Sequence, residues 1–191
     1  MGCFFQVPNA SRMRKLKNSE LGRLSIPEFK QAGKLPVTVI LDNVRSLYNI
    51  GSVFRSSDAF LIERICLCGI TACPPHRDIR KTALGATESV DWTYYRETTA
   101  AVDELKTSGY RIIAVEQTDA GIPMNEFKAS RTEKYAIIFG HEIRGVEQEI
   151  VDMADQCIEI PQFGTKHSLN ISVSAGIVLW HFHNSLHRHR S

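Results

Sequence analysis

Three polar side chains stand at alternate positions where an apolar segment begins near the C-terminal end of the sequence. Ser168, Asn170 and Ser172 alternate with leucine and isoleucine, and the apolar residues that follow recur at helical spacing. A strand-like run over 157–160 and a loop precede them. A helix that starts after a strand presents free backbone N–H groups and side-chain oxygens to a ligand. The alternative is that Ser168 only caps the helix, and this segment alone leaves both interpretations open.

Two further loops carry polar residues directly after strand-like runs. Asn49 and Arg55 follow the run 37–41, while Gly140 and Glu142 follow a later run. Asn49 is a plausible helix N-cap. Arg55 lies six positions further on, so both side chains approach one pocket only if the loop folds back over the first turns of the helix. Gly140 permits close backbone approach. Each loop alone is also compatible with ordinary capping and turn chemistry.

Short apolar runs rich in β-branched residues alternate with helical patterns along the chain. We expect buried strands at 37–41, 65–68, 112–115, 135–139 and 157–160, and helices at 50–60, 77–84, 98–107, 146–153 and from 168 onwards. This alternation predicts an α/β fold, a mostly parallel sheet with helices on both faces. Ligands of such sheets bind beyond the carboxyl ends of the strands, where the three polar loops lie.

Composition bounds the class of protein. The 191 residues are 43% hydrophobic and 23% charged, as expected for a globular domain with a real core. No apolar run approaches the length needed to span a bilayer, and the first five residues do not resemble a secretory signal. Five cysteines without repeated spacing fit a reducing compartment. We therefore expect a cytoplasmic protein without a membrane partner.

The net charge of +2 conceals an asymmetry. Residues 1–34 hold seven Lys/Arg and two Glu, a charge of +5, so residues 35–191 carry −3. A basic N-terminal arm before a nearly neutral body favours a partner with a phosphate backbone, and a solvated first helix is the alternative. The arm residues that we expect to contact such a partner are Arg12, Arg14, Lys15 and Lys17.

Two groups of potential metal ligands are present. Cys66 and Cys68 lie in an expected strand near Cys73 and His76, with a spacing that fits no common zinc site. Four histidines near the C-terminal end, His181, His183, His187 and His189, are better explained as a solvated helix end. We therefore predict no metal.

The three polar loops together resemble the motifs of a known family. Asn49-x-Gly51-x-x-x-Arg55, the segment 138–145, and Ile160-Pro161 followed by Ser168-Leu169-Asn170-Ile171-Ser172 match, in order and spacing, the SpoU/TrmH family of RNA ribose 2′-O-methyltransferases in the SPOUT superfamily. The resemblance covers roughly residues 36–182 and marks 35–191 as a SPOUT-like methyltransferase domain. It implies S-adenosylmethionine as the cofactor, RNA as the partner, a homodimer formed through the C-terminal helix, and a C-terminal trefoil knot, which is rare among folds.

The resemblance also implies roles for individual residues. Arg55 is expected to stabilise the developing alkoxide rather than to act as a base, because a guanidinium accepts no hydrogen bond. Arg45 is a candidate phosphate contact. The expected catalytic set is Arg55, Asn49, Glu142, Ser168 and Asn170, and the expected cofactor-binding set is Gly140, Ile160 and Leu169. Ser172 is expected only to cap its helix.

Two other functions are compared with methyl transfer. A catalytically silent RNA-binding module of the same fold is the main alternative, although the presence of the whole expected catalytic set favours an enzyme. A nucleotide-dependent oxidoreductase is disfavoured, because no G-x-G-x-x-G follows the first strand. Between tRNA and rRNA, the short N-terminal segment slightly favours tRNA.

Overall fold

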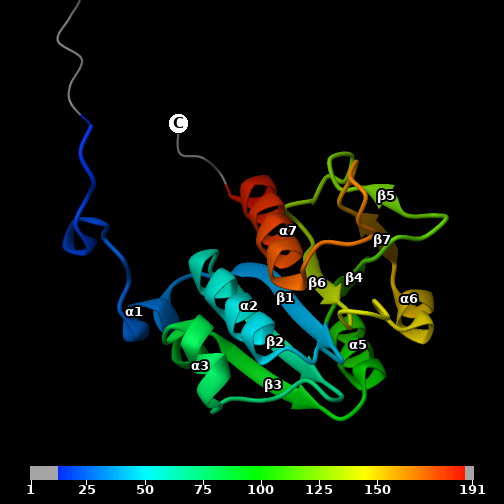
Figure 1. Ribbon diagram of the computed structural model, residues 1–191, viewed down its shortest axis with the longest axis horizontal. Coiled ribbons are helices and arrows are strands. Elements are labelled where there is room, and N and C mark those ends of the chain that lie inside the picture. Colours follow the sequence, from blue (N-terminus) through cyan, green and yellow to red (C-terminus); the bar gives the residue numbers. More distant parts are fainter. Residues whose placement is uncertain (1–12, 188–191) are drawn as a thin grey trace, which may run out of the picture.

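The computed structural model describes residues 13–187, which form one seven-stranded sheet with helices on both faces (Figure 1). The strands are β1 Leu35–Asp42, β2 Ile62–Cys68, β3 Asp91–Tyr95, β4 Tyr110–Val115, β5 Ile122–Pro123, β6 Lys134–Phe139 and β7 Gln156–Glu159. The helices are η1 Asn18–Glu20, α1 Ile26–Gln31, α2 Leu47–Ala59, α3 Arg77–Ala83, α4 Ala86–Ser89, α5 Thr98–Thr107, α6 Gln148–Met153 and α7 Ile171–Leu186.

All strand pairs in the sheet are parallel, in the order β3-β2-β1-β6-β4-β7-β5. The prediction of an α/β fold with a parallel sheet is confirmed. Because parallel strands end at the same edge, the loops that follow β1, β6 and β7 share one side of the molecule. The three polar loops of the sequence are therefore brought within reach of one another.

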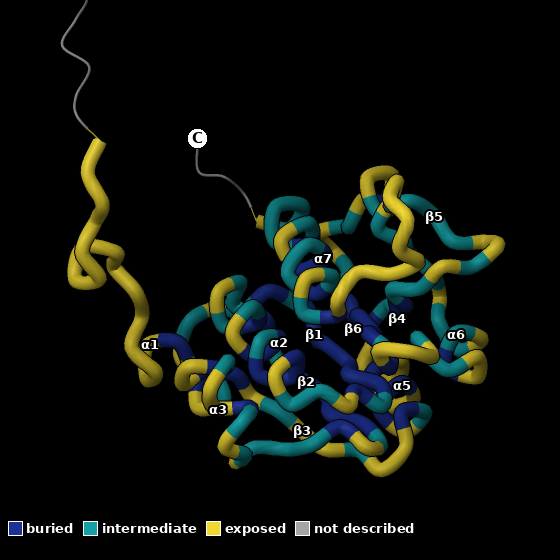
Figure 2. Tube along the Cα trace, in the orientation of Figure 1, coloured by how far each residue is buried: buried dark blue, intermediate teal, exposed yellow. Residues whose placement is uncertain are grey.

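The central strands are buried on both faces, as their uninterrupted apolar runs predict. In β1, Val39 and Leu41 belong to a core that includes Phe54 of α2 and Phe182 of α7, whereas Ile40 belongs to a second core with Leu105 of α5. Figure 2 shows these strands as the buried centre of the molecule. Residues 13–24 are exposed and extend away from the sheet on the side of α1 (Figure 2).

Two strands were missing from the sequence prediction. β3 lies at one edge of the sheet and leaves polar and aromatic side chains exposed, so it lacks the apolar run that marks a buried strand. β5 has only two residues and forms the opposite edge. Neither edge strand has a hydrophobic pattern from which a strand can be predicted.

The structure assigns the caps of two helices to residues other than the candidates in the sequence. Asn170, not Ser168, caps α7, and its side chain accepts a hydrogen bond from the backbone N–H of Ser172. Ser46, not Asn49, caps α2, which places Asn49 inside the first turn. In both helices a neighbouring residue has the extended backbone of an N-cap and a side chain that reaches the first free N–H groups.

Helix α3 packs closely on α2 at Gly51. A Cβ at Gly51 would lie 2.2 Å from Oγ1 of Thr82 and 2.3 Å from the carbonyl oxygen of Ile79, which leaves no room for a side chain. The Thr82 hydroxyl also donates to the Tyr48 carbonyl at 2.9 Å. The glycine of the Asn49-x-Gly51 pair thus fixes α3 beside the first turns of α2.

The last helix returns to the middle of the sheet. Although α7 follows β7, near the sheet edge, it packs against α2, and Figure 1 shows the two helices side by side. The expected trefoil knot stays a prediction. Across residues 13–187, no helix combines the length and apolar character that crossing a membrane requires.

Candidate active site

A pocket of about 490 Å³ lies at the carboxyl ends of β4, β6 and β7. This volume falls within the roughly 300–1,000 Å³ typical of small-molecule sites. Six of the residues predicted from the sequence line it: Gly140, Glu142, Ile160, Ser168, Leu169 and Asn170. Other lining residues include Glu116, Gln117, His141, Arg144, Gly145, Glu159 and His167.

The Glu142 carboxylate joins the loop after β6 to the start of α2. Its Oε1 accepts hydrogen bonds from the backbone N–H of Ser46 at 2.9 Å and from Nδ2 of Asn49 at 3.2 Å, and its Oε2 accepts from the N–H of Arg45 at 3.1 Å. Burial raises the pKa of Glu142, but backbone N–H groups, including its own, and the Asn49 amide outweigh this effect, so the pKa lies below its usual value. Glu142 is therefore ionised in neutral solution.

Asn49 and Asn170 connect the first and third motifs directly. Asn49 is 92% buried, since only 8% of its surface is exposed, and its Oδ1 accepts a hydrogen bond from Nδ2 of Asn170 at 3.3 Å. The Oδ1 of Asn170 accepts from the backbone N–H and hydroxyl of Ser172 at 2.9 and 2.6 Å. A continuous chain of hydrogen bonds thus runs from Ser172 through both asparagines to Glu142. The backbone N–H of Ser172, which can only donate, fixes which atom of the Asn170 amide faces Asn49, and the Ser172 hydroxyl donates to the same oxygen.

Gly140 is required by the fold of its own loop. A Cβ at Gly140 would lie 2.1 Å from the carbonyl carbon of Gly145, because the loop from His141 to Gly145 closes on itself through two backbone hydrogen bonds of 2.8 Å. The predicted close backbone approach is confirmed, and the approaching backbone is that of Gly145. The turn directs the backbone of this loop into the pocket wall.

Glu116 is a site residue that the sequence did not reveal. Its Oε2 accepts from the backbone N–H of Val146 at 2.9 Å, and a Cβ at Gly145 would lie 2.0 Å from the same oxygen. Its Oε1 accepts from the N–H of Gln117 at 2.9 Å. A single glutamate after an apolar strand carries no motif signal. Its position after β4, next to β6 in the sheet, is known only once the strand order is known.

Asp42 and Thr71 hold the loop after β1. The buried Asp42 carboxylate accepts hydrogen bonds from the Thr98 hydroxyl at 2.6 Å and from the Glu147 N–H at 3.2 Å. The Thr71 hydroxyl accepts from the N–H of Val44 at 2.9 Å and donates to a β1 carbonyl. These contacts fix the loop whose N–H groups bind Glu142.

Arg55 does not line this pocket. It lies six positions after Asn49 on α2, which rotates its side chain by about 120° from the Asn49 side chain at 3.6 residues per turn. The Arg55 side chain is exposed and forms no ion pair with any other residue in the range 13–187. Within one chain the structure therefore brings together Asn49, Glu142 and Asn170 and leaves Arg55 on a neighbouring surface.

The predicted RNA contacts occupy exposed positions. Arg45 presents its backbone N–H to Glu142 and leaves its side chain exposed. Arg14 pairs with Glu20 at 2.7 Å, and Lys15 and Lys17 are exposed. Arg12 lies outside the described residues.

The candidate metal ligands are placed apart or buried. Cys66 and Cys68 lie in β2, and burial raises the pKa of both thiols, to about 11 for Cys66. His181 contacts the carbonyl of Phe127 at 3.0 Å. In the described part of the chain, no three His, Cys, Asp or Glu side chains are grouped as a metal site requires. His189 lies outside that part.

Comparison with known proteins identifies relatives along most of the chain. The model of the SpoU rRNA Methylase family matches residues 36–180. The tRNA (guanosine(18)-2′-O)-methyltransferase of Escherichia coli K12 is 30% identical over 147 residues, which cover 75% of this chain and 61% of that protein. The 23S rRNA (guanosine-2′-O-)-methyltransferase RlmB of Neisseria meningitidis serogroup B is 29% identical over 144 residues, covering 75% and 56%. The chain thus spans about three fifths of the length of these relatives.

A solved structure shares the fold. The AdoMet-bound rRNA methyltransferase of Sinorhizobium meliloti superposes with a TM-score of 0.74 at 24% identity, over 83% of this chain and 59% of that chain. The family model covers well over half of this chain, including the loops that line the pocket described above. The chain therefore belongs to the SpoU rRNA Methylase family.

Proposed function

We propose that the protein transfers a methyl group from S-adenosylmethionine to a ribose 2′-hydroxyl of RNA. The observation that carries this proposal is the hydrogen-bond chain through Glu142, Asn49 and Asn170, which joins all three motifs beside one pocket that Glu142 and Asn170 line. Such a chain places several polar groups at fixed positions beside a site of small-molecule size. Both curated relatives above are named as RNA 2′-O-methyltransferases, which supports the same reaction.

The pocket suits a cofactor with a positive charge. Three carboxylates, those of Glu116, Glu142 and Glu159, line it together with one arginine, Arg144. The backbone that flanks Gly140 and the backbone of Leu169 supply main-chain groups for the adenine. S-adenosylmethionine, when bound, supplies the methyl group on its sulfonium sulfur. We propose that Gly140, Ile160 and Leu169 hold this cofactor and that the surrounding loops form the trefoil knot.

The protein's own residues must activate and position the 2′-hydroxyl, which is a poor nucleophile while protonated. Arg55 stabilises the negative charge that develops on the 2′-oxygen and orients the adjacent phosphate. Asn49, Asn170 and Ser168 position the ribose, and Glu142 holds Asn49 in place. The proton leaves to water or to a phosphate oxygen, because the guanidinium has no acceptor atom.

A dimer would bring Arg55 to a pocket. Val173 and Trp180, which lie two turns apart on α7, are 48% and 53% exposed, and a Cβ at Gly176 between them meets nothing within 4 Å. Exposed apolar residues of this kind on one helix favour association. We propose that two chains pair through α7 and that each pocket is completed by Arg55 of the other chain.

Mixing two inactive variants tests the composite site. If each site uses Arg55 from the opposite chain, combining Arg55→Ala with Asn170→Ala forms one intact site in each mixed dimer, so activity recovers to about a quarter of the wild-type value. If each site is built within one chain, the mixture stays inactive. Sedimentation of wild-type and Val173→Glu proteins measures the dimer itself, and a wild-type monomer at micromolar concentration would contradict this proposal.

The reaction is tested by calorimetry and by mass spectrometry of nucleosides. We expect S-adenosylmethionine to bind at micromolar to millimolar concentration, and RNA incubated with protein and cofactor to yield 2′-O-methyl nucleosides. A chain that binds RNA but not the cofactor would support the silent RNA-binding module instead. We also propose that tRNA is preferred over rRNA and that the protein is cytoplasmic. Mapping the 2′-O-methyl nucleosides in the tRNA and rRNA fractions tests the preference for tRNA.

A further inference from the structure

An aromatic and a basic side chain share one exposed face of α2. Tyr48, Ser52 and Arg55 follow the spacing i, i+4 and i+7, which aligns them along a helix. The Tyr48 side chain belongs to a residue that is 50% exposed, and Arg55 is exposed. Between them, the small Ser52 side chain donates its hydroxyl to the Tyr48 carbonyl at 2.8 Å.

Helix α3 extends this face with cations. Arg77 and Lys81, one helical turn apart, are exposed, and Lys81 Nζ lies 5.7 Å from the centre of the Tyr48 ring. The same ammonium pairs with Asp78 at 2.6 Å. Arg77 forms no ion pair with the other residues in the range 13–187. The contacts of Gly51 hold α3 against α2, so the cations keep a fixed position relative to Tyr48.

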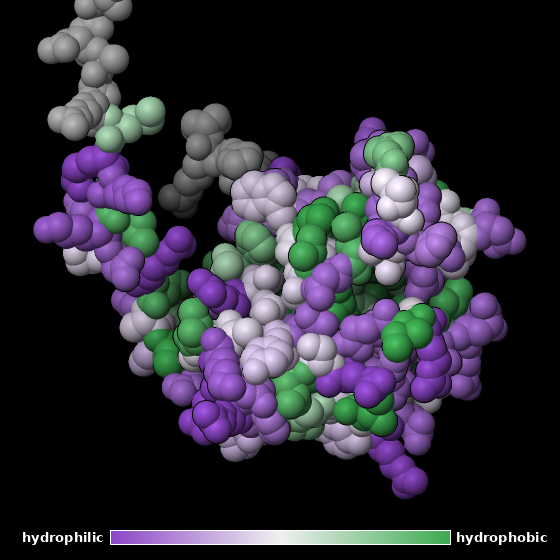
Figure 3. Space-filling model, viewed as in Figure 1, coloured by the Kyte–Doolittle hydropathy of each residue, from purple (hydrophilic) through white to green (hydrophobic). Residues whose placement is uncertain are grey.

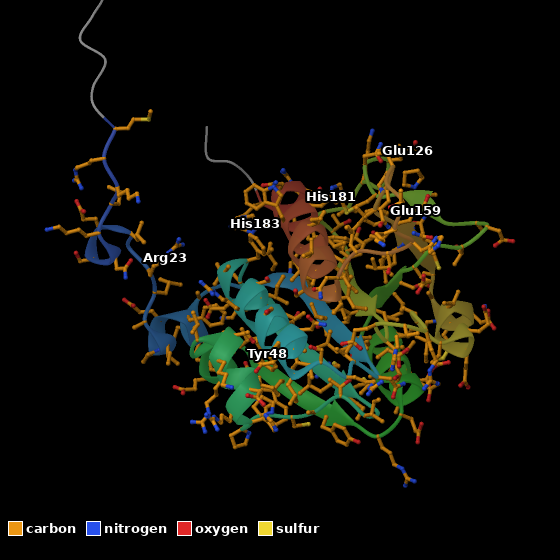
Figure 4. All side chains as sticks on the ribbon, viewed as in Figure 1. Arg23, Tyr48, Glu126, Glu159, His181 and His183 are labelled. Carbon is orange, nitrogen blue, oxygen red and sulfur yellow. The ribbon has the colours of Figure 1, made fainter. Side chains whose placement is uncertain are left out.

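The figures locate this surface on the molecule. Figure 4 shows Tyr48 on α2 beside α3, with Arg23 of the N-terminal segment on the same side of the molecule. In Figure 3 hydrophilic side chains lie over the region of α3, with hydrophobic ones beside them. We name Tyr48, Ser52, Arg55, Arg77 and Lys81 the α2–α3 face.

The α2–α3 face adjoins the site through the backbone. Tyr48 directly precedes Asn49, whose side chain is held by Glu142 and Asn170 at the pocket mouth. In the dimer proposed above, Arg55 stabilises the developing charge of the 2′-oxygen at the pocket of the other chain, so the α2–α3 face that carries Arg55 borders that pocket. Tyr48 lies about two helical turns from Arg55, so a nucleotide next to the methylated one lies close to Tyr48.

We propose that the α2–α3 face docks a single-stranded RNA segment next to the methylated nucleotide, with Tyr48 stacking on an unpaired base and Arg77 and Lys81 binding phosphates. This inference rests on the function proposed above and adds the residues that grip the RNA. Single-strand binding proteins combine aromatic platforms with a basic track along the backbone. Tyr48 has the exposed ring and α3 the cations that such a surface needs.

Variants of Tyr48 test the stacking. Filter binding of bulk tRNA is measured for wild type, Tyr48→Phe and Tyr48→Leu, with S-adenosylmethionine affinity from calorimetry as the control for folding. We expect Tyr48→Leu to weaken RNA binding by about 5- to 150-fold, the range for loss of one base stack, and Tyr48→Phe to keep most of the affinity. Equal RNA affinities for Tyr48→Leu and wild type would overturn the stacking role.

Variants of α3 test the phosphate contacts. Arg77→Ala/Lys81→Ala is compared with the matched pair Arg96→Ala/Lys106→Ala, whose two exposed cations lie after β3 and on α5, away from the α2–α3 face. Each lost contact to a single-strand phosphate lowers the slope of log affinity against log salt by about 0.7, so we expect the first pair to lower it by about 1.4 and the second to leave it unchanged.

The outcomes separate this inference from the proposed function. If the wild type methylates RNA and both pairs show the same salt slope, the α2–α3 face is not the docking surface and the proposed reaction stands. If the wild type neither binds S-adenosylmethionine nor methylates RNA, the proposed function fails and this inference fails with it.

Discussion

The side-chain amide of Asn170 donates a hydrogen bond of 3.3 Å to Oδ1 of Asn49, joining the N-terminus of α7 to the first turn of α2 across 121 positions of the sequence. Asn170 thus has two tasks, since its Oδ1 also caps α7. Asn49 is buried, and its own amide donates a hydrogen bond to Glu142. One pair of amides therefore sets the position of the third motif relative to the first.

Two substitutions of Asn170 separate these tasks. Asn170→Asp keeps an N-cap acceptor but cannot donate to Asn49, so we expect a nearly unchanged unfolding midpoint and a methylation rate lower by on the order of 100-fold. Asn170→Ala removes both contacts and additionally lowers the free energy of unfolding by about 1 kcal/mol. Thermal unfolding and initial rates measure both effects. An Asp variant with wild-type activity would show that the Asn170–Asn49 contact is not needed.

Arg55→Lys should lower the methylation rate without changing the affinity for S-adenosylmethionine. A lysine retains the positive charge but not the planar donors that contact an oxyanion and a phosphate together. We expect kcat to fall on the order of 100-fold with an unchanged dissociation constant for S-adenosylmethionine, because the contacts proposed for Arg55 are to the RNA and not to the cofactor. A variant that stays active, with a rate independent of pH in the weakly alkaline range, would remove Arg55 from both of its assigned roles.

Glu142→Gln should alter how stability depends on pH. Although burial raises the pKa of Glu142, its hydrogen bonds outweigh this and lower the pKa in the folded chain. The unfolded chain, with a pKa of about 4.3, therefore binds the proton more readily. This contribution to stability is complete above that value and is lost as the pH falls through the lower, folded pKa. We expect the difference in unfolding midpoint between wild type and Glu142→Gln to shrink from pH 6 to pH 3. A constant difference would contradict the shift.

Gly140→Ala should disrupt the pocket, because the added Cβ would lie 2.1 Å from the backbone of Gly145. Overpacking of this kind costs about 1–3 kcal/mol, and we expect it to displace the loop and weaken S-adenosylmethionine binding. Gly164→Ala is the matched control in the loop before α7, since a Cβ there meets nothing within 4 Å. Calorimetry compares the two, and equal affinities would show that the loop moves without consequence for the cofactor.

Thiol labelling checks the buried cysteines. Burial raises the pKa of Cys66 to about 11 and that of Cys68 as well, so both remain neutral and inaccessible at pH 8. We expect maleimide to modify Cys73 and Cys157, which are partly exposed, and to reach Cys66 and Cys68 only in guanidinium. Rapid labelling of Cys66 in the native protein would contradict the placement of β2.

The sequence predicted the buried strands and the motif residues for different reasons. Runs such as that of β1 are apolar on both faces, and this burial is visible in composition alone. Asn49, Glu142 and Asn170 are identified through the resemblance of the three loops, taken together, to the family motifs. Glu116 was missed because it reaches the pocket only through the placement of β4 beside β6 in the sheet, and no local sequence pattern predicts that order. The caps of α2 and α7 were misplaced because several residues near each start are good cap formers.

The return of α7 to α2 also determines when a binding site exists during synthesis. During synthesis, β1 can pair with β6 before the residues of α7 have been made. Asn49 then lacks its partner Asn170, so the growing chain holds the first two motifs without the third. The α2 and α3 pair packs through nearby residues and can form early. We therefore expect cofactor binding to arise late in folding. If the cofactor protects the protein against proteolysis, the protected fraction measures the chains in which α7 has packed against α2.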